Sequence, residues 1–177
     1  MRVITGKYKG KYIGVPSGFK ARPTTDFAKE NLFNVLRQYL DFEQTEAIDL
    51  FAGTGSISLE LVSRGCPRVV SIEIDPQHFQ FIKGVQRTLG ERHWHVVRQD
   101  ALRIAQKGSQ TFDLIFADPP YALHALKDLP RLLLDGPLLR PHTLVVVEHG
   151  SGHNFDHLPE FIEMRSYGSV NFSFFKR

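Results

Sequence analysis

The segment Ala47-Ile48-Asp49-Leu50-Phe51-Ala52-Gly53-Thr54-Gly55-Ser56 decides the fold, because it carries an apolar strand into a helix through a glycine turn. Gly53 and Gly55 allow the backbone to turn tightly and to approach a ligand closely. In an open α/β sheet this turn is where a nucleotide-like ligand binds. The dinucleotide fingerprint G-x-G-x-x-G is incomplete here, because its third position is Ser58. Two glycines alone are equally compatible with a tight structural turn.

Strands and helices alternate along the rest of the chain. Helices are expected at residues 56–63, 76–89 and 122–134, between apolar strands, and this alternation indicates a parallel sheet covered on both faces. Two late runs, 161–165 and 170–174, are separated by only four residues, which predicts an antiparallel hairpin at the end of the sheet. The other predicted strands, all rich in valine, isoleucine or leucine, are at residues 68–72, 94–97, 112–117 and 143–147.

The 177 residues fit one domain with two parts. Residues 46–177 carry the alternating pattern, and residues 1–45 are expected to be an N-terminal extension of the same domain. Within the extension, β-prone runs at residues 2–5 and 12–15 predict a hairpin. Apolar residues at helical spacing then predict a helix over residues 25–39, and either of the two residues that begin it is a suitable N-cap.

Basic residues are concentrated at the N-terminus. The first 25 residues contain six lysines and arginines and no acidic residue, although the net charge of the whole chain is only +3. Such a cluster on a nearly neutral body favours contact with a polyanion such as nucleic acid. A solvated, flexible terminus is the alternative interpretation. The basic residues are Arg2, Lys7, Lys9, Lys11, Lys20 and Arg22.

Several classes of protein are excluded by composition. Cys66 is the only cysteine, so the chain forms no internal disulfide and a reducing compartment is expected. No apolar run approaches the roughly 20 residues that span a bilayer, and the N-terminus does not read as a signal peptide. The eight histidines show no spacing typical of a metal site. We therefore expect a cytoplasmic protein with no membrane segment and no metal.

Carboxylates stand at the ends of the second and third strands. Glu73 lies 18 residues after Gly55, close to the separation of about 20 residues at which an acidic residue binds the ribose hydroxyls of a cofactor. An ordinary acidic residue at a strand end is the alternative. Asp100 follows the third strand, where its side chain could cap the next helix, contact an adenine amino group, or do both.

The tetrapeptide Asp118-Pro119-Pro120-Tyr121 is the most specific motif of the chain. It follows the fourth strand, at the same edge of the sheet as the glycine turn. Two consecutive prolines remove two backbone donors and stiffen the loop, so the Asp118 carboxylate and the Pro119 carbonyl remain as fixed acceptors. Tyr121 offers a flat surface to a base. A proline-rich turn is common, but it gives no reason for an acid and an aromatic residue to bracket the prolines.

The chain resembles the bacterial 16S ribosomal RNA guanine-N2 methyltransferases of the RsmD type over nearly its whole length. The glycine turn and the tetrapeptide are shared with many amino-methyltransferases, whereas the N-terminal segments are far more particular to this family. The matching segments are Arg2-Val3-Ile4-Thr5-Gly6-Lys7-Tyr8-Lys9-Gly10, Arg22-Pro23-Thr24-Thr25-Asp26, Lys29-Glu30, Leu32-Phe33-Asn34, the glycine turn from Asp49 to Gly55, the tetrapeptide, and Tyr167-Gly168.

The resemblance implies a Rossmann-like class I methyltransferase fold with seven strands. It implies S-adenosylmethionine as the cofactor and, as the substrate, a guanine of 16S rRNA, in free RNA or in an assembly intermediate of the small ribosomal subunit. We expect a monomer. By the same likeness residues 22–26 help to close the methionine side of the site. The residues that the resemblance assigns to the cofactor are Thr25, Phe51, Ala52, Gly53, Thr54, Gly55, Glu73, Ile74, Asp100 and Ala101.

The resulting hypothesis is direct transfer of a methyl group to the guanine N2 amine, a poor nucleophile because its lone pair is conjugated with the ring. Hydrogen bonds from this amine to Asp118 and to the Pro119 carbonyl would aim the lone pair at the methyl group, so positioning and electrostatics would supply most of the rate. The base must leave its stack to reach the site, where Tyr121 would stack on it. The residues expected to hold RNA phosphates are Arg2, Lys7, Lys9, Lys11 and Arg22.

Three other functions stay open. An adenine-N6 methyltransferase acting on DNA or RNA is the nearest, because the tetrapeptide suits either exocyclic amine. A Rossmann oxidoreductase is disfavoured by Ser58 and by the tetrapeptide. A non-catalytic RNA-binding module fits the basic N-terminus but leaves the cofactor-type residues unexplained.

Overall fold

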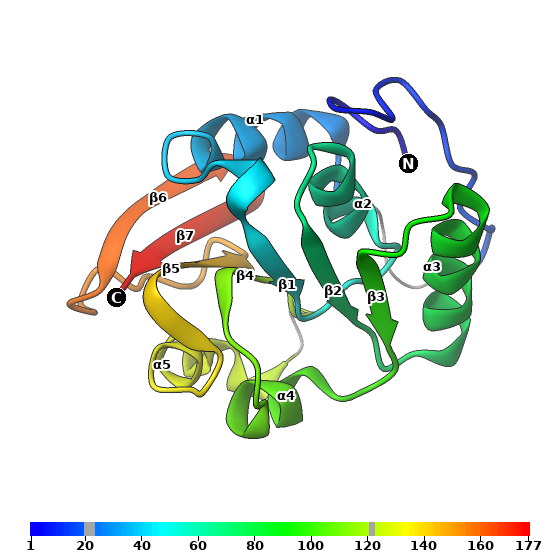
Figure 1. Cartoon of the computed structure of the whole chain (residues 1–177). Coiled ribbons are helices and arrows are strands. Elements are labelled where there is room, and N and C mark those ends of the chain that lie inside the picture. Colours follow the sequence, from blue (N-terminus) through cyan, green and yellow to red (C-terminus); the bar gives the residue numbers. More distant parts are fainter. Residues whose placement is uncertain (20–23, 121–122) are drawn as a thin grey trace.

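Seven strands form one sheet among residues 1–19, 24–120 and 123–177, the part of the chain that the computed structural model describes (Figure 1). The strand order is β3-β2-β1-β4-β5-β7-β6, with β1 to β5 parallel and β7 antiparallel to both of its neighbours. The predicted parallel sheet and its C-terminal hairpin are therefore confirmed. The strands are β1 (Glu46–Asp49), β2 (Arg68–Ile72), β3 (Trp94–Val97), β4 (Phe112–Ala117), β5 (Leu139–His149), β6 (Phe161–Tyr167) and β7 (Val170–Lys176).

Helices cover both faces of the sheet (Figure 1). They are α1 (Asp26–Leu36), α2 (Ser56–Ser63), α3 (Pro76–Leu89), α4 (Ala101–Lys107) and α5 (Leu129–Leu134), with the short 3-10 helices η1 (Phe42–Gln44) and η2 (His124–Lys127). One buried apolar cluster joins α1, α2 and α3 to the first face, and a second joins α4 and α5 to the other. The division follows the strand period, since alternate side chains of β1 and β4 enter opposite clusters.

Most predicted boundaries lie within two residues of the observed ones, and three differ by more. The helix predicted at residues 122–134 is divided into η2 and α5, because Pro130 has no amide hydrogen and favours the first turn of a new helix. The helix predicted to end at residue 39 ends at Leu36, after which the chain turns and the Tyr39 hydroxyl donates to Glu163 on β6 at 2.8 Å. Strand β5 begins at Leu139, earlier than predicted, because pairing with β4 continues to that residue across a bulge.

Local capping explains where the helices begin. The Thr25 hydroxyl accepts from the amide of Ala28 at 3.2 Å, which confirms the predicted N-cap of α1. Asp75 caps α3 by accepting from the amides of Gln77 and His78, with a proline in the first turn of the helix. These caps place the N-termini of α1 and α3 where the sequence predicts them.

The predicted N-terminal hairpin is present but short. An antiparallel bridge joins Arg2 to Tyr12, and backbone hydrogen bonds join Met1 to Ile13 and Val3 to Lys11 on either side of it. The amides of Ile4 and Thr5 donate instead to the carboxylate of Glu60 on α2, at 2.8 and 3.0 Å. Further along, the amides of residues 7 and 8 donate to the carbonyl and the hydroxyl of Ser63, at 2.8 and 3.0 Å. Because α2 takes these donors, the pairing of the hairpin stops after Val3 and the turn that follows lies against the helix.

Substitution of Gly6 provides a test of how the N-terminal segment docks on α2. A methyl group on its α-carbon would lie 1.8 Å from the carbonyl oxygen of Ser63, whereas one on Gly10 would meet no atom within 4 Å, and both residues have positive φ. We expect Gly10→Ala to lower the free energy of unfolding by roughly 1 kcal/mol, the cost of a left-handed alanine. Gly6→Ala adds a clash and should lower it by roughly 2–4 kcal/mol. Urea unfolding measures both, and equal losses would contradict the docking.

Candidate functional site

The candidate site lies where the parallel strands end. Strand β1 pairs with β2 and with β4, so the loops that follow these strands meet at one edge of the sheet. The structure thereby brings the glycine turn after β1, Glu73 after β2 and Asp118 after β4 to neighbouring positions, although 45 residues separate the last two in the sequence. This is the arrangement that the sequence motifs predict.

The glycine turn depends on left-handed backbone conformations. Gly53 has a φ of 55° and Gly55 a φ of 76°, and Gly55 is the N-cap of α2. A methyl group on Gly55 would lie 3.1 Å from the side chain of Ile82 on α3. Glycine at this position therefore permits both the turn and the close packing of α3 behind it.

Glu73 fastens the glycine turn to the end of β2. One carboxylate oxygen accepts from the amide of Gly53 at 2.7 Å, and the other accepts from the amide of Asp75 at 2.8 Å. The side chain is buried, while the neighbouring Ile74 is 62% exposed. Each oxygen retains a second lone pair, so the same carboxylate has the capacity to accept from two hydroxyls of a ligand. This contact to Gly53 is a structural role that the sequence did not indicate.

Ser58, which replaces the third glycine of the dinucleotide fingerprint, belongs to a buried chain of hydrogen bonds. The Trp94 indole donates to Ser71 at 2.8 Å, Ser71 donates to Ser58 at 2.6 Å, and Ser58 donates to the Asp49 carboxylate at 2.6 Å. Burial raises the pKa of Asp49, the Ser58 bond opposes this and nearby Glu73 adds to it, so the pKa is about 7. The serine hydroxyl thus stabilises the acid that ends β1.

Asp100 caps helix α4. Its carboxylate accepts from the amides of Leu102 and Arg103, at 2.7 and 3.3 Å, and the side chain is exposed. The capping interpretation is therefore confirmed. Contact of Asp100 and Ala101 with an adenine ring stays a prediction.

The acid of the tetrapeptide follows β4 directly and is half-buried, and Pro119 behind it is buried. Burial and, to a smaller extent, the nearby Asp49 raise the pKa of Asp118 to about 7. An Asp118 carboxyl with this pKa can accept a proton near neutral pH and release it again. Tyr121 lies outside the described residues, so its predicted stacking role stays a prediction.

Glu148, at the end of β5, is an acid of this edge that the sequence did not single out. It is only 6% exposed, and its Oε2 atom is buried with no hydrogen-bond partner among the described residues. Burial and, to a smaller extent, the nearby Asp118 raise its pKa to about 9. Its position in the sequence could have pointed to it. Like Glu73 and Asp118, Glu148 directly follows an apolar run, here Val145-Val146-Val147.

Lys29 is a second residue to which the sequence assigned no role. Its side chain is 1% exposed, and its ammonium donates to the hydroxyl of Ser56 at 3.0 Å and to the carbonyl of Arg2 at 2.5 Å. Burial lowers the pKa of Lys29, although Glu60 opposes this. Since Ser56 is the first residue of α2, the lysine joins α1 to the glycine turn and brings Thr25 into the same region.

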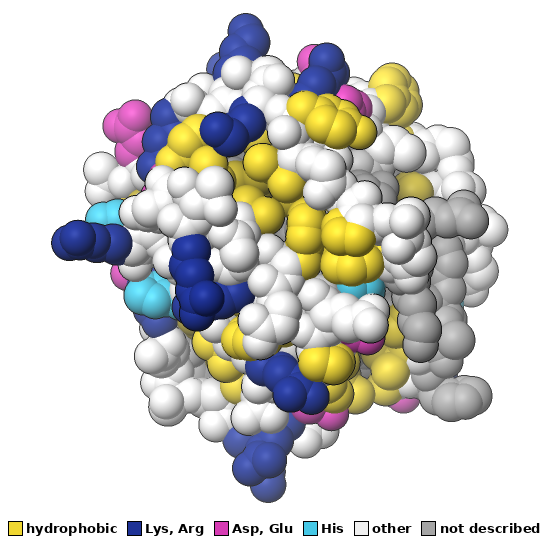
Figure 2. All heavy atoms as spheres, turned by 90° about the vertical axis from the view of Figure 1, so that its right-hand side faces the viewer, with side chains coloured by type: hydrophobic (Ala, Val, Ile, Leu, Met, Phe, Trp, Pro, Cys, Tyr) yellow, Lys and Arg dark blue, Asp and Glu magenta, His cyan; other side chains and the backbone are white. Residues whose placement is uncertain are grey.

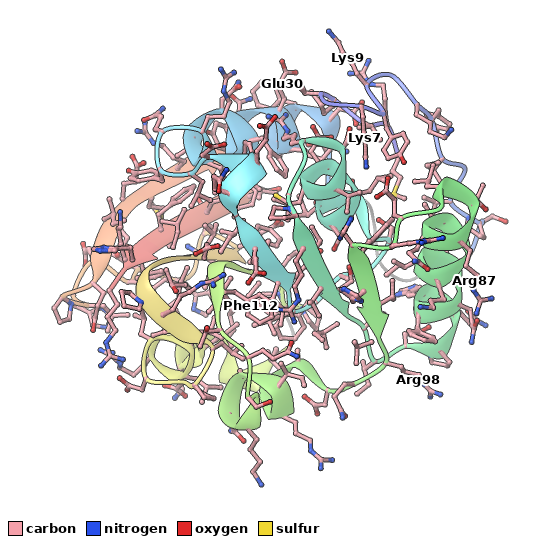
Figure 3. The ribbon with its side chains drawn as sticks, viewed as in Figure 1. Lys7, Lys9, Glu30, Arg87, Arg98 and Phe112 are labelled. Atoms are coloured by element: carbon pink, nitrogen blue, oxygen red, sulfur yellow. The ribbon has the colours of Figure 1, made fainter. Side chains whose placement is uncertain are left out.

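The residues predicted to contact RNA differ in whether they already form ion pairs within the protein. Arg2 pairs with Asp26 at 2.9 Å, and Lys7 pairs with Glu91 at 2.6 Å. Lys9 and Lys11 are exposed, and Lys9 extends from the molecule (Figure 3). Arg22 lies outside the described residues. Contact of these residues with RNA stays a prediction.

A groove of about 330 Å³ lies between the N-terminal segment and α3. Hydrophobic side chains gather in the middle of this face, with lysine and arginine side chains around them (Figure 2). Arg87, near the end of α3, points outward from the same side (Figure 3). The groove is lined by Ile13, Gln80, Phe81, Gly84, Val85, Thr88 and Leu89, so it is separate from the edge that carries the carboxylates.

No group of three or more histidine, cysteine, aspartate or glutamate side chains is arranged to hold a metal ion within the described part of the chain. In the same residues, no helix has the length and apolar character needed to cross a membrane. Cys66 is buried, and burial raises the pKa of its thiol to about 12, as expected of a packed cysteine.

Known proteins resemble this chain along most of its length. The family model of conserved hypothetical protein 95 matches residues 1–176. Ribosomal RNA small subunit methyltransferase D of Escherichia coli is 34% identical over 149 residues, which are 84% of this chain and 74% of that protein.

Solved structures resemble the fold. A hypothetical protein of Thermus thermophilus superposes with a TM-score of 0.84 at 29% identity, covering 100% of this chain and 99% of that one. An RNA methyltransferase of Salinibacter ruber, solved in complex with S-adenosyl-L-homocysteine, has a TM-score of 0.65 at 18% identity, covering 88% and 93%, and shows the fold alone. The chain belongs to the conserved hypothetical protein 95 family, the family of RsmD-type methyltransferases.

Proposed function

We propose that this protein transfers a methyl group from S-adenosylmethionine to the exocyclic N2 amine of a guanine in small-subunit rRNA. The observation that carries the proposal is the pair of acceptors after β4, the Asp118 carboxylate and the Pro119 carbonyl, beside a glycine turn and a strand-end acid. Membership of the RsmD-type family supports the reaction, and the name of the Escherichia coli relative supports the rRNA substrate.

The residues at the carboxyl edge fit S-adenosylmethionine. The glycine turn, residues 51–55, would contact the cofactor through its backbone, because Gly53 and Gly55 present no side chain there. Glu73 would accept from the ribose hydroxyls with the lone pairs that Gly53 and Asp75 leave free. Exposed Ile74 offers apolar surface to an adenine ring. When bound, S-adenosylmethionine supplies a methyl group activated by a positively charged sulfur.

Asp118 and Pro119 would prepare the amine for attack. An exocyclic amine has two N–H donors, and a carboxylate and a carbonyl at the same place accept one each. These bonds orient the nitrogen lone pair, and orientation of this kind contributes strongly to rate enhancement. When the nitrogen gains a carbon substituent it must lose a proton, and Asp118, with a pKa of about 7, is placed to receive it.

The RNA would approach across the N-terminal segment. Lys9 and Lys11 are exposed on this segment and could contact phosphates. Phosphate contacts position a nucleic acid without reading its sequence. Arg2 and Lys7 would need to leave, or to share, their partners Asp26 and Glu91. A base must leave its stack to reach a site at the edge of a sheet.

The identity of the methylated base is the first test. We expect RNA treated with the protein and labelled S-adenosylmethionine to yield labelled N2-methylguanosine after digestion to nucleosides. Mass mapping of small-subunit rRNA from cells lacking the protein should show one guanosine without its methyl group. Labelled N6-methyladenosine as the only product would replace the guanine proposal with the adenine alternative.

Substitution of Asp118 separates its two roles. Asp118→Ala removes the acceptor and should lower kcat by roughly a hundredfold to ten-thousandfold, the usual contribution of a positioned acid or base. Asp118→Asn keeps an oxygen acceptor but cannot take a proton, so its loss should be smaller. In the wild type, kcat at saturating substrates should rise with pH through about 7, because Asp118 loses its proton in this range. The rise of kcat with pH should be absent in Asp118→Asn. Wild-type turnover by Asp118→Ala would refute the assignment.

Glu73 tests the cofactor site. Glu73→Gln removes the charge and leaves one oxygen to serve two backbone amides and a ribose, so affinity for S-adenosylmethionine should fall about tenfold to a hundredfold. Calorimetric titration measures this directly. The matched control is Glu30→Gln, because Glu30 is exposed on α1 and points away from the sheet (Figure 3). An unchanged Kd for Glu73→Gln, with Glu30→Gln also unchanged, would place the ribose elsewhere.

A further inference from the structure

Glu148, one residue before the end of β5, lies level with Asp118, which follows β4 directly. Strands β4 and β5 are parallel, and their last paired residues are Ala117 and Val147. Asp118 and Glu148 are the next residue on each strand. Because paired residues of a parallel sheet direct their side chains to the same face, the two carboxyl groups lie side by side on one face of the sheet. This closeness agrees with the effect of Asp118 on the pKa of Glu148.

The strand order separates Glu148 from the cofactor residues. Strands β2, β1, β4 and β5 are consecutive in the sheet, so Glu73 and the glycine turn lie on one side of Asp118 and Glu148 lies on the other. A ligand of an open α/β sheet binds where the strand order reverses, which here is between β1 and β4. If the cofactor occupies the β1 and β2 side, the group that receives the methyl must approach from the side of β5.

Glu148 has an unused hydrogen-bonding atom. Its Oε2 is buried and without a partner in the described part of the chain, and a buried polar atom left in this state is costly. The adjacent His149 cannot supply the bond, since its two ring nitrogens are already engaged with the Gly150 carbonyl at 2.9 Å and the Ser173 hydroxyl at 2.8 Å. We therefore expect a bound molecule to supply the hydrogen-bond partner that Glu148 Oε2 lacks.

Burial, together with the neighbouring Asp118, raises the pKa of Glu148 and so favours the carboxylic acid form of its side chain near neutral pH. A carboxylic acid presents one O–H donor and one carbonyl acceptor side by side. Guanine presents the complementary pair, an N1–H donor and an O6 acceptor, directly beside its N2 amine. Adenine, placed with its amine in the same position, presents a bare N1 acceptor and no oxygen.

We propose that Glu148 is the residue that selects the target base, pairing its carboxyl group with N1–H and O6 of the guanine whose N2 amine contacts Asp118 and Pro119. This inference rests on the proposed function and adds to it the choice of guanine over other amine-bearing bases. Discrimination of this kind is strong when a buried polar group is left unpaired by the wrong substrate.

The test uses a base that keeps the amine and loses the proposed contacts. 2-Aminopurine carries the C2 amine of guanine but has no O6 and no hydrogen on N1. We expect the wild-type protein to methylate an RNA fragment with guanosine at the mapped position at least about tenfold more efficiently, in kcat/KM, than the same fragment with 2-aminopurine. Equal efficiency on the two fragments would overturn the inference without any variant.

Two substitutions then assign the preference to Glu148. Glu148→Gln retains one donor and one acceptor and should keep the preference for guanosine. Glu148→Leu retains neither, so the ratio of the two kcat/KM values should fall towards one. Glu30→Gln serves as the matched acidic control and should keep the wild-type ratio. If Glu148→Leu folds and keeps that ratio, Glu148 does not read the base.

The outcomes separate this inference from the proposed function. Transfer to adenosine and not to guanosine by the wild-type protein would refute the proposed function itself. Transfer to guanosine with no preference over 2-aminopurine would leave the proposed function intact and refute only the role of Glu148. If Glu148→Leu does not fold, the wild-type comparison and the Glu148→Gln ratio still decide the question.

Discussion

The parallel pairing of β1 with β2 on one side and with β4 on the other is the constraint on which the candidate site depends. It carries the glycine turn, Glu73 and Asp118 to one edge of the sheet. Parallel strands need long crossover connections, and helices α2 and α3 supply them while covering one face. The residues that share a site are therefore separated in the chain by whole helices.

Burial of acidic groups at this edge has a chemical consequence. Asp49 and Glu148 are buried. A row of acids near the carboxyl ends of β2, β1, β4 and β5 (Glu73, Asp49, Asp118 and Glu148) places like charges next to one another. Both effects raise the pKa values, to about 7 for Asp49 and Asp118 and to about 9 for Glu148. Carboxyl groups of one row thus differ in protonation near neutral pH, and such differences allow one acid to accept a proton while another donates a hydrogen bond.

The N-terminal segment is held to the same framework by buried polar contacts. Glu60 accepts from two of its amides and also from the Arg64 guanidinium at 2.9 Å, while Lys29 connects α1 with the start of α2. These contacts are inside the protein, where an ion pair loses much of its hydration and breaking it by removing one partner is costly. The backbone that carries Arg2, Lys7, Lys9 and Lys11 is consequently held against α2.

The sequence by itself determined the elements and most of the chemistry. Apolar runs, helical spacing and capping residues depend on neighbours within about one helical turn, so β2, β3, β4, α2 and α3 were predicted with the bounds that the structure has. The glycine turn, Glu73 and the tetrapeptide were recognisable because each stands directly after such a run.

Only the tertiary structure decided which of these residues meet. The proximity of Glu148 to Asp118, the bond from Lys29 to Ser56 and the chain from Trp94 to Asp49 each join residues far apart in the sequence. Strand register and helix docking fix these contacts, and neither is encoded in any short stretch of residues.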